Sequence, residues 1–395
     1  MTESTSRRTF LKTAGVAAAA LTLPVSGQEP SNAPAPRIVA GPYLQHVAPD
    51  AATVMWVTDT PCLSWVDYGP TPELGNRLQN SRHGLVDAYD VIHRIRISGL
   101  VPGHPCYYRV TSREIALFEP YRVDFGGQVE DAVRQFAPPL PEAGRVDFVV
   151  FNDVHGNGDT WAQLHGLAAR APFDFLAVNG DLLDHIQEHG QVANRFLAPG
   201  AGPLEGERPL VFVRGNHEAR GQYARRLLDY FDTPGGGYYY AFTRGPVHFL
   251  VLDGGEDKLD ESNEYFGLVN FKPYLEQEAV WVADQVKSDA FRQAAFRVVL
   301  CHIPLAASKP GDYRAPIVEA LDGAGVDLSI SGHTHTPAYR EPEPSRDYPI
   351  VIGGANEPAN ATVIRVEADP AVMRMQIMRA DGTVLESREF SARRA

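Results

Sequence analysis

Between residues 145 and 335, five short apolar runs each end abruptly in Asp, Asn or His. The first run, 145–151 (RVDFVVF), is followed at once by Asp153 and His155. Helical stretches such as 218–232 and 274–288 separate the runs, so the pattern indicates strands that alternate with helices. In such folds the strand ends meet at one edge of a sheet. Any one of these polar residues could be a solvated loop residue, but together they predict a shared site.

The residues at the five strand ends share one property, because all offer oxygen or nitrogen ligands to a metal ion. They are Asp153, His155, Asp181, Asn216, His302, His333 and His335. Imidazoles and carboxylates suit cations such as zinc, iron(II) and manganese. Seven ligands exceed what one such ion needs, and a shared carboxylate can bridge two ions. Glycines flank four of the five strand ends and would let the backbone turn sharply beside a crowded site.

The order of these motifs resembles that of the calcineurin-like metallophosphoesterase superfamily over about residues 145–365. The matching motifs are Asp-x-His, Gly-Asp, Gly-Asn-His-Glu, a single His and Gly-His-Thr-His. The resemblance implies two divalent or trivalent ions (Fe, Mn or Zn), with Asp181 as the bridging ligand. One ion would be held by Asp153, His155, Asp181 and His335, and the other by Asp181, Asn216, His302 and His333. It also implies hydrolysis of phosphate esters by attack of a metal-bound hydroxide.

Two further segments, GDLLDH and RGNHE, resemble motifs of serine/threonine protein phosphatases. The resemblance implies that the Asp184 carboxylate hydrogen-bonds His217 and keeps it ready to protonate the leaving group. His185 stands where that family has an Arg that binds phosphate, so we expect weaker, pH-dependent substrate binding from it. The alternative is that Asp184 caps a loop and His185 packs.

The N-terminal third of the chain has a different pattern. Residues 37–127 contain short strand candidates separated by turn signals, which predicts an all-β sandwich. LVPGHPCYYRV resembles a fibronectin type III signature, and PYLQHVAPDAATVMWVTD resembles the N-terminal domain of purple acid phosphatases. We expect Cys62 and Cys106 at opposite ends of neighbouring strands, as free thiols. Residues 128–144 are a predicted connector. Residues 145–395 would form an α/β (α+β) catalytic domain with a central β-sandwich flanked by helices.

The first residues indicate where the protein goes. SRRTFLK, followed by an Ala-rich run, resembles a twin-arginine export signal over residues 1–27, and 28–36 is a polar, Pro-rich linker. The run is too short for a mature membrane span. We therefore expect export by the twin-arginine machinery, a periplasmic or secreted protein and no stable membrane span after processing. An uncleaved anchor is the alternative.

Charge and motifs together limit the function. A formal net charge of −13 argues against binding a nucleic-acid backbone. We expect a small phosphate-ester substrate and a phosphomonoesterase activity. A phosphodiesterase of the nucleotide or glycerophosphodiester type is the alternative, and a non-catalytic cell-surface binding protein is the competing class.

Overall fold

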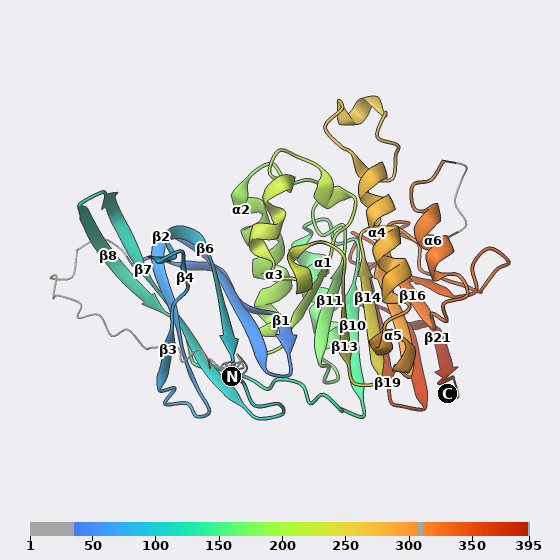
Figure 1. Cartoon of the computed structure of the whole chain (residues 1–395), viewed down its shortest axis with the longest axis horizontal. Coiled ribbons are helices and arrows are strands. Elements are labelled where there is room, and N and C mark those ends of the chain that lie inside the picture. Colours follow the sequence, from blue (N-terminus) through green and yellow to red (C-terminus); the bar gives the residue numbers. More distant parts are fainter. Residues whose placement is uncertain (1–34, 307–310, 394–395) are drawn as a thin grey trace, which may run out of the picture.

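The computed structural model describes residues 35–306 and 311–393. The predicted signal peptide, 1–27, lies outside the described residues, as does most of the predicted linker 28–36. Figure 1 shows a sheet-rich N-terminal part beside a larger part in which helices flank the strands. Among the described helices, none combines the length and the apolar character needed to cross a membrane.

The N-terminal part is one seven-stranded sheet rather than two separate sheets. The reason is the length of β2 (Ala51–Gly69), whose first half pairs with β1 and β6 and whose second half pairs with β3 and β7. Both halves contribute to one core around Trp56 and Tyr108. The strands that were expected to form a sandwich therefore belong to a single hydrogen-bonded sheet, and the two-sheet description is not confirmed. Its other strands are β1 (Ile38–Ala48), β3 (Asn76–Leu78), β6 (Ala88–Ser98), β7 (Cys106–Glu119), β8 (Arg122–Glu130) and β9 (Arg134–Phe136), and β4 (Ser81–Arg82) pairs separately with β5 (Leu85–Val86).

The sheet continues past residue 127. Strand β8 ends at Glu130, and β9 pairs with the start of β7, where Phe136 lies opposite Cys106. The predicted connector 128–144 therefore begins inside the sheet. Cys62 lies opposite Glu114, at the other end of the β2–β7 pair, and all three cysteines are free, as predicted.

The larger part contains two six-stranded sheets. In order across the first sheet the strands are β12 (Leu210–Val213), β11 (Phe175–Asn179), β10 (Val146–Phe151), β19 (Thr362–Ala368), β20 (Val372–Arg379) and β21 (Val384–Ser391). In the second they are β13 (Tyr240–Arg244), β14 (Val247–Leu252), β15 (Phe296–Cys301), β16 (Leu328–Ser331), β18 (Ile350–Ile352) and β17 (Ala338–Arg340). Phe148 and Phe175 pack edge-on against Phe249, with ring centroids 5.1 and 5.6 Å apart, so a common core joins the sheets.

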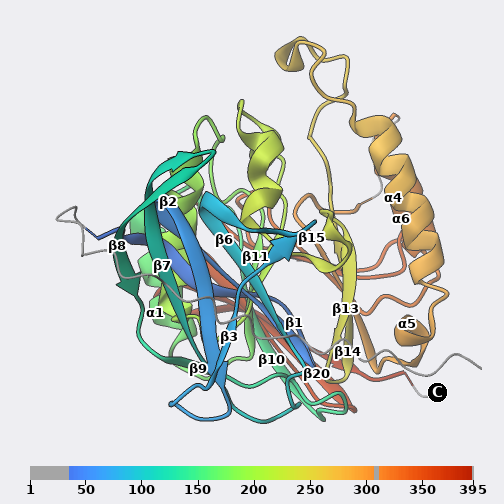
Figure 2. The ribbon, with the colours of Figure 1, turned by 60° about the vertical axis from the view of Figure 1, so that its left-hand side comes forward.

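Helices cover the outer faces of the two sheets. Trp161 and Leu164 of α1 (Gly158–Ala168) share a core with Phe151, and α4 (Phe271–Gln285) packs with α6 (Ala315–Leu321) over the other sheet. Figure 2 shows α4 and α6 together on one side of the molecule. The shorter helices are α2 (His189–Gln191), a π-helix (Val192–Leu197), α3 (Ala198–Ala201) and α5 (Asp289–Gln293).

The expected helix 218–232 is instead two 3₁₀ segments, His217–Ala219 and Ala224–Tyr230. Gly221 lies between them with a φ of +96°, and a Cβ on it would meet the backbone oxygen of Ile186 at 2.2 Å. The chain must turn there to pass a neighbouring loop, and this interrupts the helix. The predicted helix 274–288 corresponds to α4.

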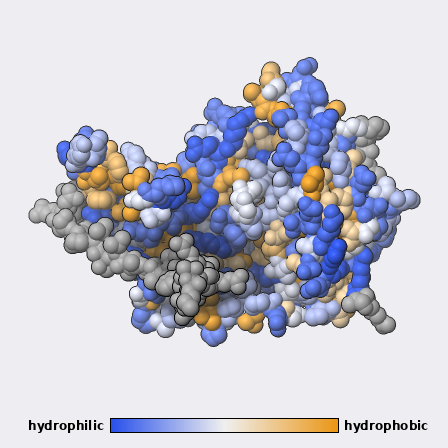
Figure 3. Space-filling view, in the orientation of Figure 1, coloured by the Kyte–Doolittle hydropathy of each residue, from blue (hydrophilic) through white to orange (hydrophobic). Residues whose placement is uncertain are grey.

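Polar contacts fix the two parts of the molecule to each other. Tyr43 donates to the carbonyl of Tyr230 at 2.8 Å, and Tyr108 donates to that of Gly206 at 2.6 Å. Tyr43 also belongs to the same apolar core as α1, so the interface is partly a continuous core. The surface is hollowed between the upper ends of the two parts (Figure 3).

Candidate metal centre

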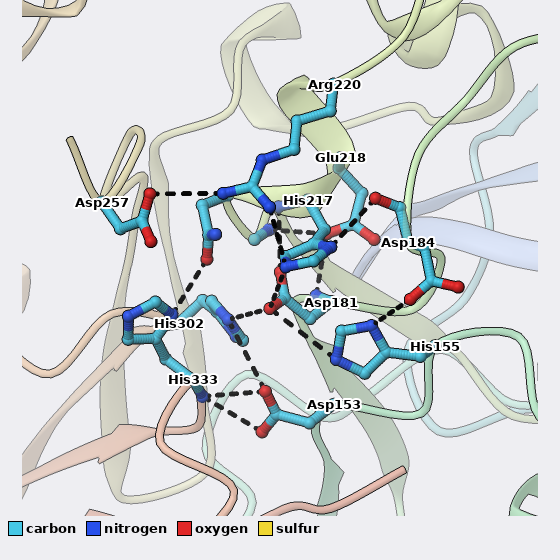
Figure 4. Close-up of polar contacts among 12 residues, drawn as sticks. Asp153, His155, Asp181, Asp184, His217, Glu218, Arg220, Asp257, His302 and His333 are labelled. Carbon is cyan, nitrogen blue, oxygen red and sulfur yellow. Dashed lines mark hydrogen bonds and ion pairs between the residues drawn. The ribbon is translucent and has the colours of Figure 1, made fainter. Parts of the chain in front are cut away.

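All seven predicted ligands lie at the ends of strands that run in parallel. Strands β10, β11 and β12 are parallel neighbours in one sheet, and β15 and β16 are parallel neighbours in the other. Each strand leads directly into a loop that carries predicted ligands, so the loops meet at one edge of the paired sheets. Figure 4 shows five of these side chains pointing toward one another, those of Asp153, His155, Asp181, His302 and His333.

The ligand atoms form two groups that share Asp181. Those of Asp153, His155, Asp181 and His335 all lie within 4.8 Å of one another, as do those of Asp181, His302 and His333. The Asn216 Oδ1 atom lies 3.0 Å from Nδ1 of His333, which places this amide in the second group. The structure therefore brings together the two sets that the resemblance implied.

The chemistry of this donor set fits metal ions. His302 is fully buried, and its Nδ1–H donates to the carbonyl of Asn179 at 2.8 Å. Its Nε2 is then a lone pair 3.0 Å from the Asp181 carboxylate, and it has no hydrogen-bond partner among the described residues. Two acceptors can face each other in a buried site only if a cation or a proton lies between them.

The electrostatics of the site lead to the same conclusion. Burial raises the pKa of Asp153 to about 7, and the nearby Asp181 carboxylate adds to this effect. Burial opposes a charge on His302, but the Asp181 carboxylate raises the pKa of His302 to about 10. Burial lowers the pKa of His333 to about 4, which keeps its lone pair available. Two buried carboxylates that raise the pKa of a neighbouring buried imidazole in this way favour a positive charge between them.

Backbone strain is concentrated at the same residues. Non-glycine residues with positive φ are uncommon, and each costs on the order of 1–3 kcal/mol. Five of the seven ligands have this conformation: Asp153 (53°), His155 (50°), Asp181 (52°), His333 (69°) and His335 (54°). The surrounding structure must hold these residues in place, and strain of this kind clusters at functional sites.

Glycines beside the ligands are required because there is no space for a side chain. A Cβ on Gly180 would lie 2.4 Å from Cγ of His302, and one on Gly215 would lie 2.3 Å from the backbone nitrogen of Asp181. A Cβ on Gly332 or Gly354 would lie 2.4 or 2.1 Å from the Asp153 carboxylate. Of these four, only Gly180 and Gly354 also have positive φ. Close approach to the ligands, and not only a sharp turn, explains these glycines.

Glu218 is a site residue to which the sequence gave no role, although it belongs to the Gly-Asn-His-Glu motif. Its buried carboxylate accepts hydrogen bonds from the backbone N–H groups of Asp181, Leu182, Leu183 and Gly215, at 2.7–3.1 Å. Burial, and then the charge of Asp181, raise the pKa of Glu218. This side chain joins the loop after β11 to the loop after β12, and so positions Asp181.

The predicted hydrogen bond between the Asp184 carboxylate and His217 is not formed. Asp184 Oδ1 instead lies 2.8 Å from Nδ1 of His155, and His217 Nδ1 donates to the backbone carbonyl of Asp184 at 2.9 Å. The two residues are neighbours, as the resemblance implied, but the carboxylate points toward a metal ligand. Carboxylates in this position fix the orientation of a ligating imidazole and make it more basic.

The other nitrogen of His217 faces the centre. Its Nε2 lies 3.9 Å from the Asp181 carboxylate and 2.9 Å from Nη1 of Arg220, a residue that the sequence did not single out. Arg220 follows the Gly-Asn-His-Glu motif by two positions, which was the available signal. His185 is exposed and forms no side-chain hydrogen bond among the described residues, so its substrate-binding role remains a prediction.

Comparisons with known proteins identify the family that the catalytic part resembles. Residues 146–337 match the family described as calcineurin-like phosphoesterase, and residues 4–24 match the twin-arginine translocation pathway signal sequence, which indicates export to the periplasm or the medium. The serine/threonine-protein phosphatase CPPED1 of Danio rerio is 25% identical over 243 residues, covering 54% of this chain and 76% of that protein. CPPED1 of Bos taurus is 26% identical over 224 residues, covering 50% and 67%.

Two solved structures share the fold. Purple acid phosphatase PPD1 from yellow lupin (Lupinus luteus) matches with a TM-score of 0.63 and 16% identity, covering 90% of this chain and 74% of that one. PhoD matches with a TM-score of 0.57 and 12% identity, covering 89% and 92%. Both likenesses extend over the N-terminal sheet. Residues 146–337 are therefore a calcineurin-like phosphoesterase domain, and the chain is a phosphoesterase that carries a twin-arginine signal sequence.

Proposed function

We propose that this protein is an exported, dinuclear metal-dependent phosphoesterase that acts on phosphomonoesters. The observation that carries the proposal is the pair of ligand groups that share the Asp181 carboxylate. Asp153, His155 and His335 would complete the site of one ion, and Asn216, His302 and His333 that of the other. The ions would be divalent or trivalent Fe, Mn or Zn, because the donors are imidazoles, carboxylates and an amide.

The ions would stabilise negative charge on the phosphoryl group and would activate a water molecule as the nucleophile. The chain's own residues supply the rest of the reaction. Glu218 and Asp184 hold Asp181 and His155 in position. We assign the protonation of the leaving group to His217, since its Nδ1 is fixed by a carbonyl and its Nε2 faces the bridging carboxylate.

The names of the relatives favour monoesters. CPPED1 is named a serine/threonine-protein phosphatase, and the lupin protein is named a purple acid phosphatase. A phosphodiesterase of the nucleotide or glycerophosphodiester type remains the second candidate, since loops outside the ligand set decide specificity. A non-catalytic binding protein would not require two complete ligand groups.

Two test esters separate these candidates. Purified protein loaded with Mn²⁺, Zn²⁺ or Fe²⁺ should bind two ions per chain and hydrolyse p-nitrophenyl phosphate with a higher kcat/KM than bis(p-nitrophenyl) phosphate. Asp181→Asn should abolish both activities. A preference for the diester would favour the phosphodiesterase. Two bound ions without hydrolysis of either ester would contradict the catalytic proposal.

A further inference from the structure

The Arg220 guanidinium is a cation in direct contact with the imidazole that faces the metal ligands. Its Nη1 lies 2.9 Å from Nε2 of His217, and that Nε2 lies 3.9 Å from the Asp181 carboxylate. The His217 imidazole therefore lies between the Arg220 guanidinium and the Asp181 carboxylate. Figure 4 shows Arg220 extending over His217 toward the ligand cluster.

Two carboxylates hold this guanidinium in one orientation. Arg220 Nε and Nη2 donate to the two oxygens of Glu256, each at 2.9 Å, and Nη2 also donates to Asp257 at 3.2 Å. Glu256 is only 4% exposed, so the protein around it holds its carboxylate in place. A bidentate pair of this kind fixes both the position and the plane of the guanidinium.

The remaining donors of Arg220 face the site. A guanidinium has five N–H groups, and the contacts with the two carboxylates use the N–H of Nε and both of those on Nη2. One N–H of Nη1 points to His217, and the other has no acceptor among the described residues. The side chain is 29% exposed, so a ligand entering from solvent can reach these donors.

We propose that Arg220 binds a non-bridging oxygen of the substrate's phosphoryl group and selects for phosphomonoesters; this inference rests on the function proposed above. When the substrate binds, Nη1 donates to the phosphoryl oxygen instead of to His217. The Nε2 lone pair of His217 is then released from Arg220, so it can take up a proton from solvent and pass it to the leaving group.

The charge of the substrate decides how much this contact contributes. A phosphomonoester has three non-bridging oxygens and carries up to two negative charges near neutral pH, whereas a diester has two such oxygens and one charge. A planar, permanently charged guanidinium therefore matches a phosphomonoester better than a diester. Removing Arg220 should therefore weaken monoester binding more than diester binding.

The test uses inorganic phosphate as the probe, so it does not depend on turnover. Calorimetric titration of the metal-loaded full chain should show Arg220→Gln binding phosphate about 10- to 100-fold more weakly than wild type, the range expected for a lost charge-assisted hydrogen bond. Arg226→Gln is the matched control, because Arg226 is exposed and pairs only with Asp229. Arg220→Lys should retain part of the affinity.

Metal analysis and ester kinetics complete the experiment. Arg220→Gln should keep the wild-type metal content and should raise KM for p-nitrophenyl phosphate more than for bis(p-nitrophenyl) phosphate. Glu256→Gln should give a smaller change in the same direction. Unchanged phosphate affinity, or loss of metal from Arg220→Gln, would overturn the inference. Metal-loaded wild-type protein that hydrolyses neither ester would overturn the proposed function instead, and the phosphate titration would still decide the role of Arg220.

Discussion

At the scale of single residues, Asp181 is the side chain that the two groups of candidate metal ligands share. It belongs to both ligand groups, and its two oxygens also face His302 and the backbone of His217. His302 belongs to only one group. A carboxylate shared by two sites cannot be replaced without affecting both.

Substitution of these two residues should therefore have different effects on metal content. Asp181→Asn should lower the binding of both ions, whereas His302→Ala should deplete mainly one of them, because His302 belongs only to the second ligand group. Elemental analysis of the purified variants after dialysis measures this. Equal ion content in the two variants would show that Asp181 does not bridge.

Asp184 should act through the metal site rather than through His217. Its carboxylate contacts Nδ1 of His155, so Asp184→Asn should weaken metal binding by about 10- to 100-fold. It should also lower the rates of hydrolysis of activated nitrophenyl esters and of alkyl esters to a similar degree. The exposed Asp159→Asn serves as the control. If Asp184→Asn keeps its full metal content and loses activity only on alkyl esters, the carboxylate of Asp184 acts through His217, as the sequence suggested.

His93 in the N-terminal sheet should make the protein sensitive to acid. It is buried against Trp56, and burial lowers the pKa of His93 to about 3. The unfolded chain binds a proton on this residue below about pH 6.5 and the folded chain does not, so stability falls by about 1.4 kcal/mol per pH unit below that point. His93→Gln should reduce the difference between urea midpoints at pH 7 and pH 5. The exposed His104→Gln should leave that difference as in wild type.

At the scale of elements, the strand-to-loop junctions carry the site. At the junctions after β11 and β16, a ligand with positive φ follows a glycine that packs against another ligand. Gly180 precedes Asp181 and packs against His302, and Gly332 precedes His333 and packs against Asp153. Glu218 then joins two of the loops through four backbone hydrogen bonds. The loops are therefore shaped by one another as much as by their own strands.

A methyl group at such a junction should displace a ligand. Gly332→Ala places a Cβ 2.4 Å from the Asp153 carboxylate, so it should reduce metal content and activity by at least about tenfold, because positions in a metal site tolerate only small shifts. Gly166→Ala in α1 is the control, since a Cβ there meets nothing within 4 Å. That change should raise stability by about 0.5–1 kcal/mol. Full metal binding by Gly332→Ala would show that the loop can adjust.

At the scale of the whole molecule, the N-terminal sheet and the catalytic part form one packed unit. Residues of β1 and β2 share an apolar core with α1, and tyrosines of the sheet donate to carbonyls on the other side. The loop that accepts from Tyr108 precedes β12, which leads to Asn216. The sheet thus supports the part of the chain that carries the second ligand group.

Thermal unfolding should accordingly show one cooperative transition. Tyr108→Phe leaves the buried carbonyl of Gly206 without its donor and should cost about 1–3 kcal/mol. Tyr107→Phe is the matched control, because the neighbouring side chain faces the other side of the strand and forms no side-chain hydrogen bond among the described residues. Calorimetry measures both. A separate melting transition for the N-terminal sheet would show that this sheet and the catalytic part do not unfold as one unit.

The sequence by itself predicted the seven candidate ligands and the strands that carry them, and the structure brings these residues together. Asp153, His155 and the other five ligands could be found because each follows an apolar run directly, and parallel strand ends meet at one edge of a sheet. The free cysteines could be predicted for a similar reason, since β2 and β7 pair along their length. These features depend on short spans of chain and on simple rules of strand geometry.

Only the tertiary structure decided which side chains meet across loops. Asp184 pairs with His155 instead of His217, and Arg220 pairs with Glu256, 36 residues away. Such contacts depend on the paths of the loops and the directions of the side chains, and the spacing of motifs along the sequence specifies neither. The single N-terminal sheet likewise follows from β2 pairing with two sets of strands along its length. Local sequence places the ligands, but packing over long sequence distances sets the hydrogen bonds that orient them.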